Sequence, residues 1–159
     1  MKSLRNWCTF ALLLALPTMS ASAEPLADRF EGQWTCKSRS DGKTFTWSVR
    51  RDLAGGWLTG EGIEAGRRLS LDVWAYDAGQ RLQRRRQFTP AGAIIEMDVI
   101  ERTNEHLRLE GTMVHRDGRI IRVRERIMFK KMSQFDAVWE VDDGSGWRAV
   151  VDEICEKPV

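Results

Sequence analysis

The stretch Gly32-Gln33-Trp34-Thr35-Cys36 decides the fold that this sequence predicts. We interpret it as the first strand of a closed β-barrel whose last strand ends at Cys155. First and last strands are neighbours in a closed barrel, which brings the two Cα atoms to the roughly 5.5–6 Å that a disulfide requires. In an open ten-stranded sheet they would lie about 40 Å apart. We therefore expect a Cys36–Cys155 disulfide, and two separate buried thiols are the alternative.

Residues 1–23 have the features of a secretory signal peptide. Lys2 and Arg5 precede an apolar run over 10–16, and Ala21-Ser22-Ala23 is a cleavage site of the A-x-A type. The run is shorter than the roughly 20 residues that span a bilayer, and no later run is longer. We expect residues 24–159 to form one domain without a membrane span. We also expect it to be periplasmic or secreted, where an oxidising environment favours the disulfide.

Short segments of alternating polar and apolar residues follow one another from residue 32 to residue 155. Glycine-containing or polar turns separate them, as in an all-β sandwich or barrel. The expected strands are 32–38, 44–53, 57–64, 69–77, 81–88, 93–100, 105–114, 119–130, 134–142 and 147–155. About ten strands joined by short turns predict a single antiparallel up-and-down barrel, because so long a sheet tends to curl and close. Residues 25–30 have room for one helical turn that could close the base.

The alternation also predicts which side chains face outward. One face of the sheet is apolar and the other is charged, whereas a membrane-spanning barrel has its apolar band outside. The arginines expected on the outer face are Arg81, Arg85, Arg108, Arg122, Arg124, Arg126 and Arg148. Segments 57–64 and 69–77 carry apolar residues on both faces, with Trp74 and Tyr76 opposite Leu71 and Val73. Trp74 and Tyr76 are therefore candidates for an exposed docking surface.

The charge balance bounds the classes of partner. Without Lys2 and Arg5, the 25 basic side chains fall to 23, equal to the 23 acidic ones. A neutral domain gives no general electrostatic reason to bind nucleic acid. We expect a monomer or a weak dimer. The stripe of Arg122, Arg124 and Arg126 is either a solvated face or a surface that meets a polyanion or protein partner.

Several short motifs resemble those of the calycins, the superfamily of lipocalins and fatty-acid-binding proteins. Phe30-x-Gly32-x-Trp34 resembles their Gly-x-Trp signature. Trp74-x-Tyr76-Asp77, Gly111 and the segment 142–147 are similar to small bacterial lipocalin-like proteins, close in shape to nitrobindin-type ten-stranded barrels. The resemblance implies a cup that holds a small hydrophobic or amphipathic molecule. It also implies a basic side chain over the signature Trp34, for which Arg148 is the candidate. The short turn 39–43 replaces the helical portal of fatty-acid-binding relatives.

The strand 81–88 supplies the candidate ligand site. If its odd positions face water, Arg84 and Arg86 face inward, where a guanidinium needs an anionic partner. Glu125 faces inward by the same alternation. The functional interpretation is a carboxylate- or phosphate-bearing ligand held by Arg84 or Arg86. Its apolar part would contact Trp47, Met97, Phe129, Phe135 and Trp139. The structural interpretation is an internal Arg–Glu network, or arginines that reach the rim.

Other chemistry has weaker support in the sequence. His115 lies two positions after Met113 and so could share its inward face. It either points into the barrel mouth, where a haem iron could bind it, or lies solvated beside the following turn. Glu61 and Glu125 could form a carboxylate pair, although solvated or ion-paired glutamates are commoner. The sequence shows no cluster of metal ligands and no activated nucleophile, so we expect no catalytic residue and no metal.

Together these features predict an exported, non-enzymatic lipocalin-like protein that binds a small hydrophobic or amphipathic ligand, anionic if the arginines contact it. Two alternatives remain open from the sequence. One is an envelope module for protein–protein interaction, and the other is a haem-dependent enzyme on a calycin scaffold.

Overall fold

The computed structural model describes residues 29–52, 57–77 and 82–158. They form ten strands, and the sequence predicted each boundary to within two residues. The strands are β1 (Gly32–Ser38), β2 (Thr44–Asp52), β3 (Trp57–Glu64), β4 (Arg67–Asp77), β5 (Leu82–Phe88), β6 (Ile94–Arg102), β7 (His106–Val114), β8 (Ile120–Lys131), β9 (Gln134–Asp142) and β10 (Arg148–Glu156). The predicted signal peptide and most of the predicted helical turn lie outside the described residues.

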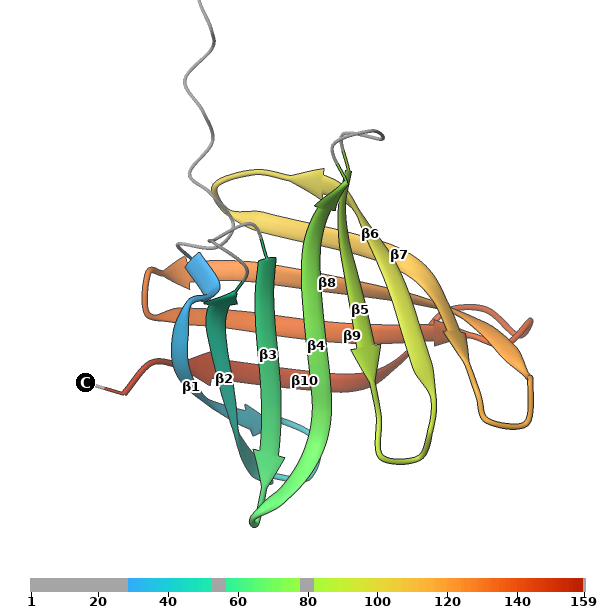
Figure 1. Cartoon of the computed structure of the whole chain (residues 1–159), viewed down its shortest axis with the longest axis horizontal. Helices are drawn as coiled ribbons and strands as arrows, with labels where there is room; N and C mark the ends of the chain where they lie inside the picture. Colours follow the sequence, from blue (N-terminus) through green and yellow to red (C-terminus); the bar gives the residue numbers. More distant parts are fainter. Residues whose placement is uncertain (1–28, 53–56, 78–81, 159) are drawn as a thin grey trace, which may run out of the picture.

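The strands form a closed antiparallel barrel, as the sequence predicted. Each strand pairs with the next one along the chain, and β10 pairs with β1 to complete the circle. In Figure 1 the strands β8, β9 and β10 cross behind β1 to β4, so the sheet wraps around a common interior. This topology places the turns β1–β2, β3–β4, β5–β6, β7–β8 and β9–β10 at one end of the barrel. That end is called the mouth below, and the opposite end is called the base.

The tight turns depend on residues that accept a positive φ. Ala65 and Gly66, which join β3 to β4, have φ values of 47° and 76°. Two successive positive values match the hairpin turns whose twist suits the flanking strands. Gly118, with φ 85°, allows the β7–β8 turn to close, where the Arg119 carbonyl accepts a hydrogen bond of 2.8 Å from the His115 amide. Short turns of this kind make each strand the neighbour of the next.

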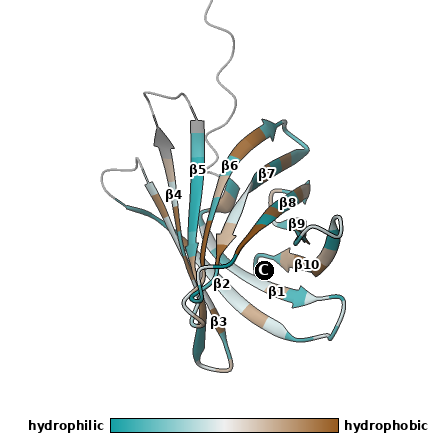
Figure 2. Cartoon of the chain, turned by 90° about the vertical axis from the view of Figure 1, so that its right-hand side faces the viewer, coloured by the Kyte–Doolittle hydropathy of each residue, from teal (hydrophilic) through white to brown (hydrophobic). Residues whose placement is uncertain are grey.

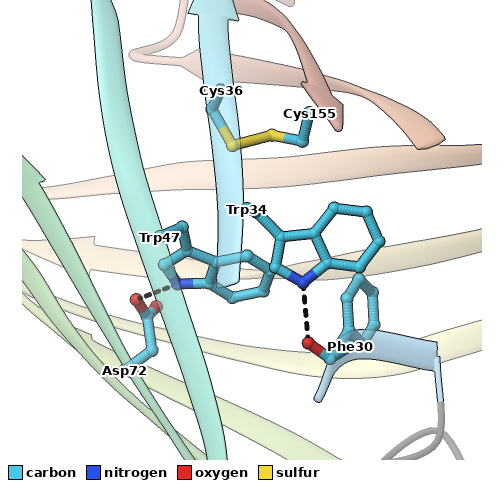
Figure 3. The surroundings of a disulfide bond; sticks show 6 residues. All are labelled: Phe30, Trp34, Cys36, Trp47, Asp72 and Cys155. Carbon is cyan, nitrogen blue, oxygen red and sulfur yellow. Dashed lines mark hydrogen bonds between the residues drawn. A yellow bond between two sulfur atoms is a disulfide. The ribbon is translucent and has the colours of Figure 1, made fainter. Parts of the chain in front are cut away.

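The seam between β1 and β10 carries the predicted disulfide. Cys36 and Cys155 are cross-strand partners with a Cα–Cα distance of 4.0 Å, and an S–S bond of 2.02 Å joins them across 119 residues of sequence. Figure 3 shows the two side chains meeting inside the barrel. Both cysteines are buried, with 1% exposure each. The bond therefore links the ends of the meander from within.

Aromatic side chains fill the base. Phe30 is fully buried, and its ring lies 5.4–5.7 Å from the ring centroids of Trp47, Trp74, Phe129 and Phe135. The Trp34 indole nitrogen donates a hydrogen bond of 2.8 Å to the Phe30 carbonyl, as Figure 3 shows. Aromatic burial of this kind contributes strongly to stability because each ring removes a large apolar area from water. The base of the barrel is thus a packed core.

A basic side chain covers Trp34, but it is not Arg148. The Lys157 ammonium lies 4.7 Å from the centroid of the Trp34 ring. Arg148 lies at the other end of β10, where it pairs with Asp143 at 3.8 Å. The prediction for Arg148 is wrong because β10 runs from the mouth to the base, and Trp34 lies near the base, close to the end of β10.

The orientation predicted for β5 is also wrong. Arg85, which was expected outside, is buried, and its side chain is 6% exposed. Arg84 and Arg86, which were expected inside, have side chains 40% and 52% exposed and pair on the outer wall with Asp98 and Glu96. Figure 2 shows β5 as mostly hydrophilic along its length, so its colour does not distinguish its inner from its outer face.

Strand register explains this orientation. Arg85 is the cross-strand partner of Trp74 in β4 and of Met97 in β6. Cross-strand partners share a face of the sheet, and both partners are buried. Arg85 must therefore face the interior. Arg81 lies outside the described residues, whereas Arg108, Arg122, Arg124, Arg126 and Arg148 form ion pairs outside, as expected.

The ambiguous strand β4 is resolved by the same pairing. Trp74 is buried with 4% exposure, while Leu71 is 38% exposed on the outer face. The predicted exposed docking surface at Trp74 is therefore wrong, because the indole belongs to the aromatic core at the base. The side chain of Tyr76 lies outside the part of the chain that is described.

Candidate ligand-binding cavity

A cavity of about 480 Å³ occupies the half of the barrel between the mouth and the packed base. Its rim includes residues of the β1–β2 turn and Glu64 at the end of β3, and its deepest wall includes Trp47, Phe135 and Trp139. The volume lies within the range of about 300–1,000 Å³ that is usual for small-molecule sites. The barrel is therefore filled at one end and hollow at the other.

Apolar side chains from seven strands make most of the cavity wall. Apart from Val150, at the bulge in β10, they come from alternate positions of each strand, because successive side chains of a strand point to opposite faces. The apolar lining residues are Phe45, Trp47, Leu69, Ile95, Met113, Val123, Ile127, Phe135, Trp139, Val141, Val150 and Val151. The disulfide also contributes to the wall, through Cys36. Such a wall suits the apolar part of a ligand.

Glycine in β3 makes room for the polar part of the wall. A Cβ atom at Gly60 would lie 2.8 Å from the Trp47 indole nitrogen and 3.3 Å from the Asp72 Cβ. Without that atom, the Trp47 indole can lie against β3 and reach the Asp72 carboxylate, to which it donates a hydrogen bond of 3.3 Å (Figure 3). Gly60 is thus required for the contact between these two lining residues.

Three charged side chains meet at the floor of the cavity, and we call them the inner triad: Arg85, Asp72 and Glu125. Arg85 Nε donates to Asp72 Oδ1 at 2.8 Å, Nη2 lies 2.7 Å from the same oxygen, and Nη1 donates to Glu125 Oε2. Asp72 is completely buried and Glu125 is 3% exposed. Each guanidinium nitrogen of Arg85 therefore already contacts a carboxylate.

Neighbouring side chains hold the inner triad in place. The Arg85 guanidinium lies 5.0 Å from the Trp74 ring centroid and 4.9 Å from that of Trp139. Ser70 donates a hydrogen bond of 3.1 Å to Asp72. Aromatic faces attract a cation through their electron-rich surfaces, so the two indoles stabilise the buried guanidinium. Such burial is tolerated only when the charge is paired in this way.

Burial and charge shift the acidity of these groups. Burial by itself would lower the pKa of Arg85, but the charges of Asp72 and Glu125 and the hydrogen bonds to them raise it above its ordinary value. Burial raises the pKa of Glu125, and the contact with Arg85 offsets this only in part. Desolvation disfavours the charged form of a carboxyl group unless a partner compensates for it.

A fourth ionisable group, Glu153 of β10, lines the cavity above the disulfide. Its carboxylate oxygen lies within 4.8 Å of the sulfur atoms of Cys36 and Cys155. Burial, followed by the charge of Glu125, raises the pKa of Glu153 to about 7. Among the described residues, this is the one cluster with the composition of a metal site. The disulfide occupies both sulfurs, so no thiolate remains to bind a metal.

The structure brings together about half of the predicted ligand site. Trp47, Phe135, Trp139 and Glu125 line the cavity, as expected. Met97 and Phe129 do not line it; both belong to the core, and the Phe129 ring lies 5.6 Å from that of Phe30 at the base. Arg84 and Arg86 lie on the opposite side of the sheet from the cavity.

The other predicted groups lie away from the cavity. Glu61 pairs with Arg68 on the outer face, so it cannot form a carboxylate pair with the interior Glu125. His115 lies in the β7–β8 turn and is not part of the cavity lining. The structural interpretation of a turn-adjacent histidine therefore describes His115 better than the interpretation as a haem ligand.

Sequence reasoning missed Asp72, Arg85 and Glu153. Two of them carried a usable signal. Asp72 lies two positions before Trp74, and Glu153 lies two positions before Cys155, so each shares a strand face with a buried residue. A charged residue two positions from a buried tryptophan or half-cystine is thus a candidate for the interior.

Comparisons with known proteins add no homologue: no protein-family model matches the chain, and no curated protein matches it either. Within the described residues, no helix has both the length and the apolar composition needed to cross a membrane.

Proposed function

We propose that this protein is an exported, lipocalin-like binding protein that holds a small hydrophobic or amphipathic molecule in its barrel and does not catalyse a reaction. The observation that carries the proposal is the cavity of about 480 Å³, apolar along its wall and polar at its floor. Small-molecule sites combine a mostly apolar wall with a few placed polar groups in this way. The Gly-x-Trp motif at Gly32–Trp34, with a basic side chain over the indole, supports the lipocalin-like assignment.

Export is part of the same proposal. Support comes from the A-x-A site at Ala21–Ala23 and from the Cys36–Cys155 disulfide, which persists in oxidising compartments. The reason to expect an anionic ligand no longer applies, because Arg84 and Arg86 lie on the outer face and Arg85 is already paired with carboxylates.

The two alternative functions have less support. The outer arginines Arg122, Arg124 and Arg126 pair with Asp142 and Glu140, so the stripe presents little net positive charge to a partner. For haem chemistry, the candidate ligand His115 lies away from the cavity.

Calorimetric titration with octan-1-ol tests the proposal. The Met113→Trp substitution fills part of the cavity from β7, and Thr112→Trp places the same side chain on the outer face as a matched control. We expect saturable binding to the wild type and to Thr112→Trp, and weaker binding to Met113→Trp. Equal binding to all three, or no binding to any of them, would contradict the proposal.

A further inference from the structure

Acidic side chains outnumber basic ones among the residues that line the cavity. Five are acidic and two are basic. The acidic residues are Asp41, Glu64, Asp72, Glu125 and Glu153, and the basic ones are Lys43 and Arg85. The domain beyond the predicted signal peptide has equal numbers of acidic and basic side chains, so this excess is local to the cavity. A cleft lined mainly by one sign of charge concentrates ligands of the opposite sign.

The two basic residues cannot readily receive an anion. Lys43 pairs with Asp41 at 3.2 Å on the rim. All three guanidinium nitrogens of Arg85 contact Asp72 or Glu125, and the indoles of Trp74 and Trp139 lie beside its guanidinium. An anionic ligand would have to displace one of these carboxylates and leave it buried without a partner, which is costly.

Two of the acidic lining residues, Glu64 at the rim and Glu153 in the interior, form no ion pair with the described residues, and Glu153 is the one that lies within the barrel. Its side chain lies against the cavity, above the disulfide, and it forms no hydrogen bond or ion pair with the described residues. Its charged neighbours across the barrel are Glu125 of β8, Asp72 of β4 and Arg85 of β5, with Asp152 beside it on β10. Three of these four are acidic, so an ionised Glu153 stands in a field that favours a cation.

The rest of the wall suits the same kind of ligand. Phe45, Trp47, Phe135 and Trp139 present aromatic side chains to the cavity, and aromatic faces attract ammonium groups. Ile95, Val123 and Val141 provide an apolar surface for a hydrocarbon tail.

We infer that the cavity binds an amphipathic cation of the alkylamine class, with the ammonium group paired to Glu153 and the hydrocarbon part along the apolar wall. This inference rests on the proposed function, and it specifies the class of ligand that the cavity takes. A bound ammonium group would offset part of the excess negative charge of the cavity lining, which has more carboxylates than cations.

The test compares three ligands with the same hydrocarbon chain, octylamine, octan-1-ol and octanoate, by calorimetric titration at pH 8. At this pH octylamine is protonated and Glu153, with a pKa of about 7, has largely lost its proton. We expect the full-length protein to bind octylamine about tenfold more tightly than octan-1-ol, the ratio that a single partly buried ion pair can supply. Octanoate should bind most weakly.

Two variants assign the preference to one side chain. Glu153→Gln keeps the shape of the side chain and removes its charge, so octylamine and octan-1-ol should bind it equally. Glu156→Gln makes the same chemical change on the outer face of β10, where Glu156 accepts a hydrogen bond from Gln134, and should retain the preference. Circular dichroism verifies that both variants are folded.

Each outcome decides between the two proposals. Binding of octan-1-ol with no preference for octylamine, or a preference that survives Glu153→Gln, overturns the cation inference and leaves the proposed function standing. Tighter binding of octanoate than of octylamine also overturns the inference. If none of the three ligands binds, the proposed function fails, and the inference fails with it.

Discussion

Arg84, Arg85 and Arg86 are consecutive residues of one strand, yet they occupy two different environments. Arg84 and Arg86 belong to an outer ladder of ion pairs that we define as Arg84–Asp98, Arg86–Glu96 and Arg124–Glu140. Arg85 belongs to the inner triad with Asp72 and Glu125, where its side chain is 6% exposed. The same residue type is therefore a solvated surface group on one face of β5 and a buried structural charge on the other.

The largest effect is expected from removing the inner arginine. Arg85→Met leaves two carboxylates buried without a counter-charge, which should lower the free energy of unfolding by about 3–5 kcal/mol. Arg86→Met removes an outer charge that water already screens, and should change the free energy by no more than about 1 kcal/mol. Urea unfolding followed by tryptophan fluorescence measures both values. A loss below about 1 kcal/mol for Arg85→Met would show that the triad is not buried as described.

The pH dependence of stability should differ in sign between the two faces. The pKa of Glu153 is raised from 4.5 to about 7 in the folded protein. Its contribution to the free energy of unfolding is therefore complete below pH 4.5 and is lost as the pH rises through 7. Glu153→Gln should therefore stabilise the protein at pH 8 by about 3 kcal/mol at most, and have little effect near pH 4.5.

Glu140 on the outer ladder provides the opposite case. Hydrogen bonds from Arg124 lower the pKa of Glu140, so its contribution is present above its ordinary pKa and is lost on acidification. Glu140→Gln should destabilise the protein at pH 7 and have progressively less effect as the solution becomes acidic. Unfolding curves at several pH values distinguish the two variants. The same pH profile for both would refute the assignment of Glu153 to the interior.

A rescue experiment should have an intermediate effect. In the Arg85→Met background, Glu125→Gln replaces a stranded buried carboxylate with a neutral amide, and should restore about 1–3 kcal/mol of the lost stability. In the wild-type background the same change removes a partner of Arg85 and should be destabilising. Additive effects of the two substitutions, measured by a double-mutant cycle in urea, would argue against direct contact between Arg85 and Glu125.

The smallest effect is expected on the outer ladder. A double-mutant cycle for Arg86→Met and Glu96→Gln, whose side chains are 52% and 45% exposed, should give a coupling energy of about 0.2–1 kcal/mol at low salt. The coupling should decrease in 1 M salt, where the screening length falls to about 3 Å. A coupling above about 3 kcal/mol that is insensitive to salt would remove the distinction between the ladder and the triad.

The architecture was predictable because it depends on local and repetitive signals. Alternating apolar residues and short turns gave ten strands within two residues of their observed bounds, and the Cys36–Cys155 pair required closure of the barrel. Hydrophobic alternation is a strong signal wherever one face of a strand is buried and the other is solvated.

The site was less predictable, because the interior of this barrel is partly polar. In β5 both faces carry charged or polar residues, so alternation cannot say which face is inside. The orientation comes from register: Arg85 lies beside Trp74 and Met97, on strands that the sequence does not align with β5. The prediction of the side chain over Trp34 was wrong for a related reason. Lys157 reaches the ring from beyond the end of β10, and alternation within the strands does not place such a residue.

NMR of the tryptophan indoles during a titration with octan-1-ol would show whether the barrel is hollow above the inner triad. Trp47 and Trp139 line the cavity, whereas Trp34 lies at the packed base and Trp57 is 43% exposed on the outer wall. If the barrel is hollow there, the Trp47 and Trp139 indole signals should show saturable shifts, and those of Trp34 and Trp57 should stay unchanged. Shifts confined to Trp57, or no saturable shift at any indole, would contradict a hollow interior.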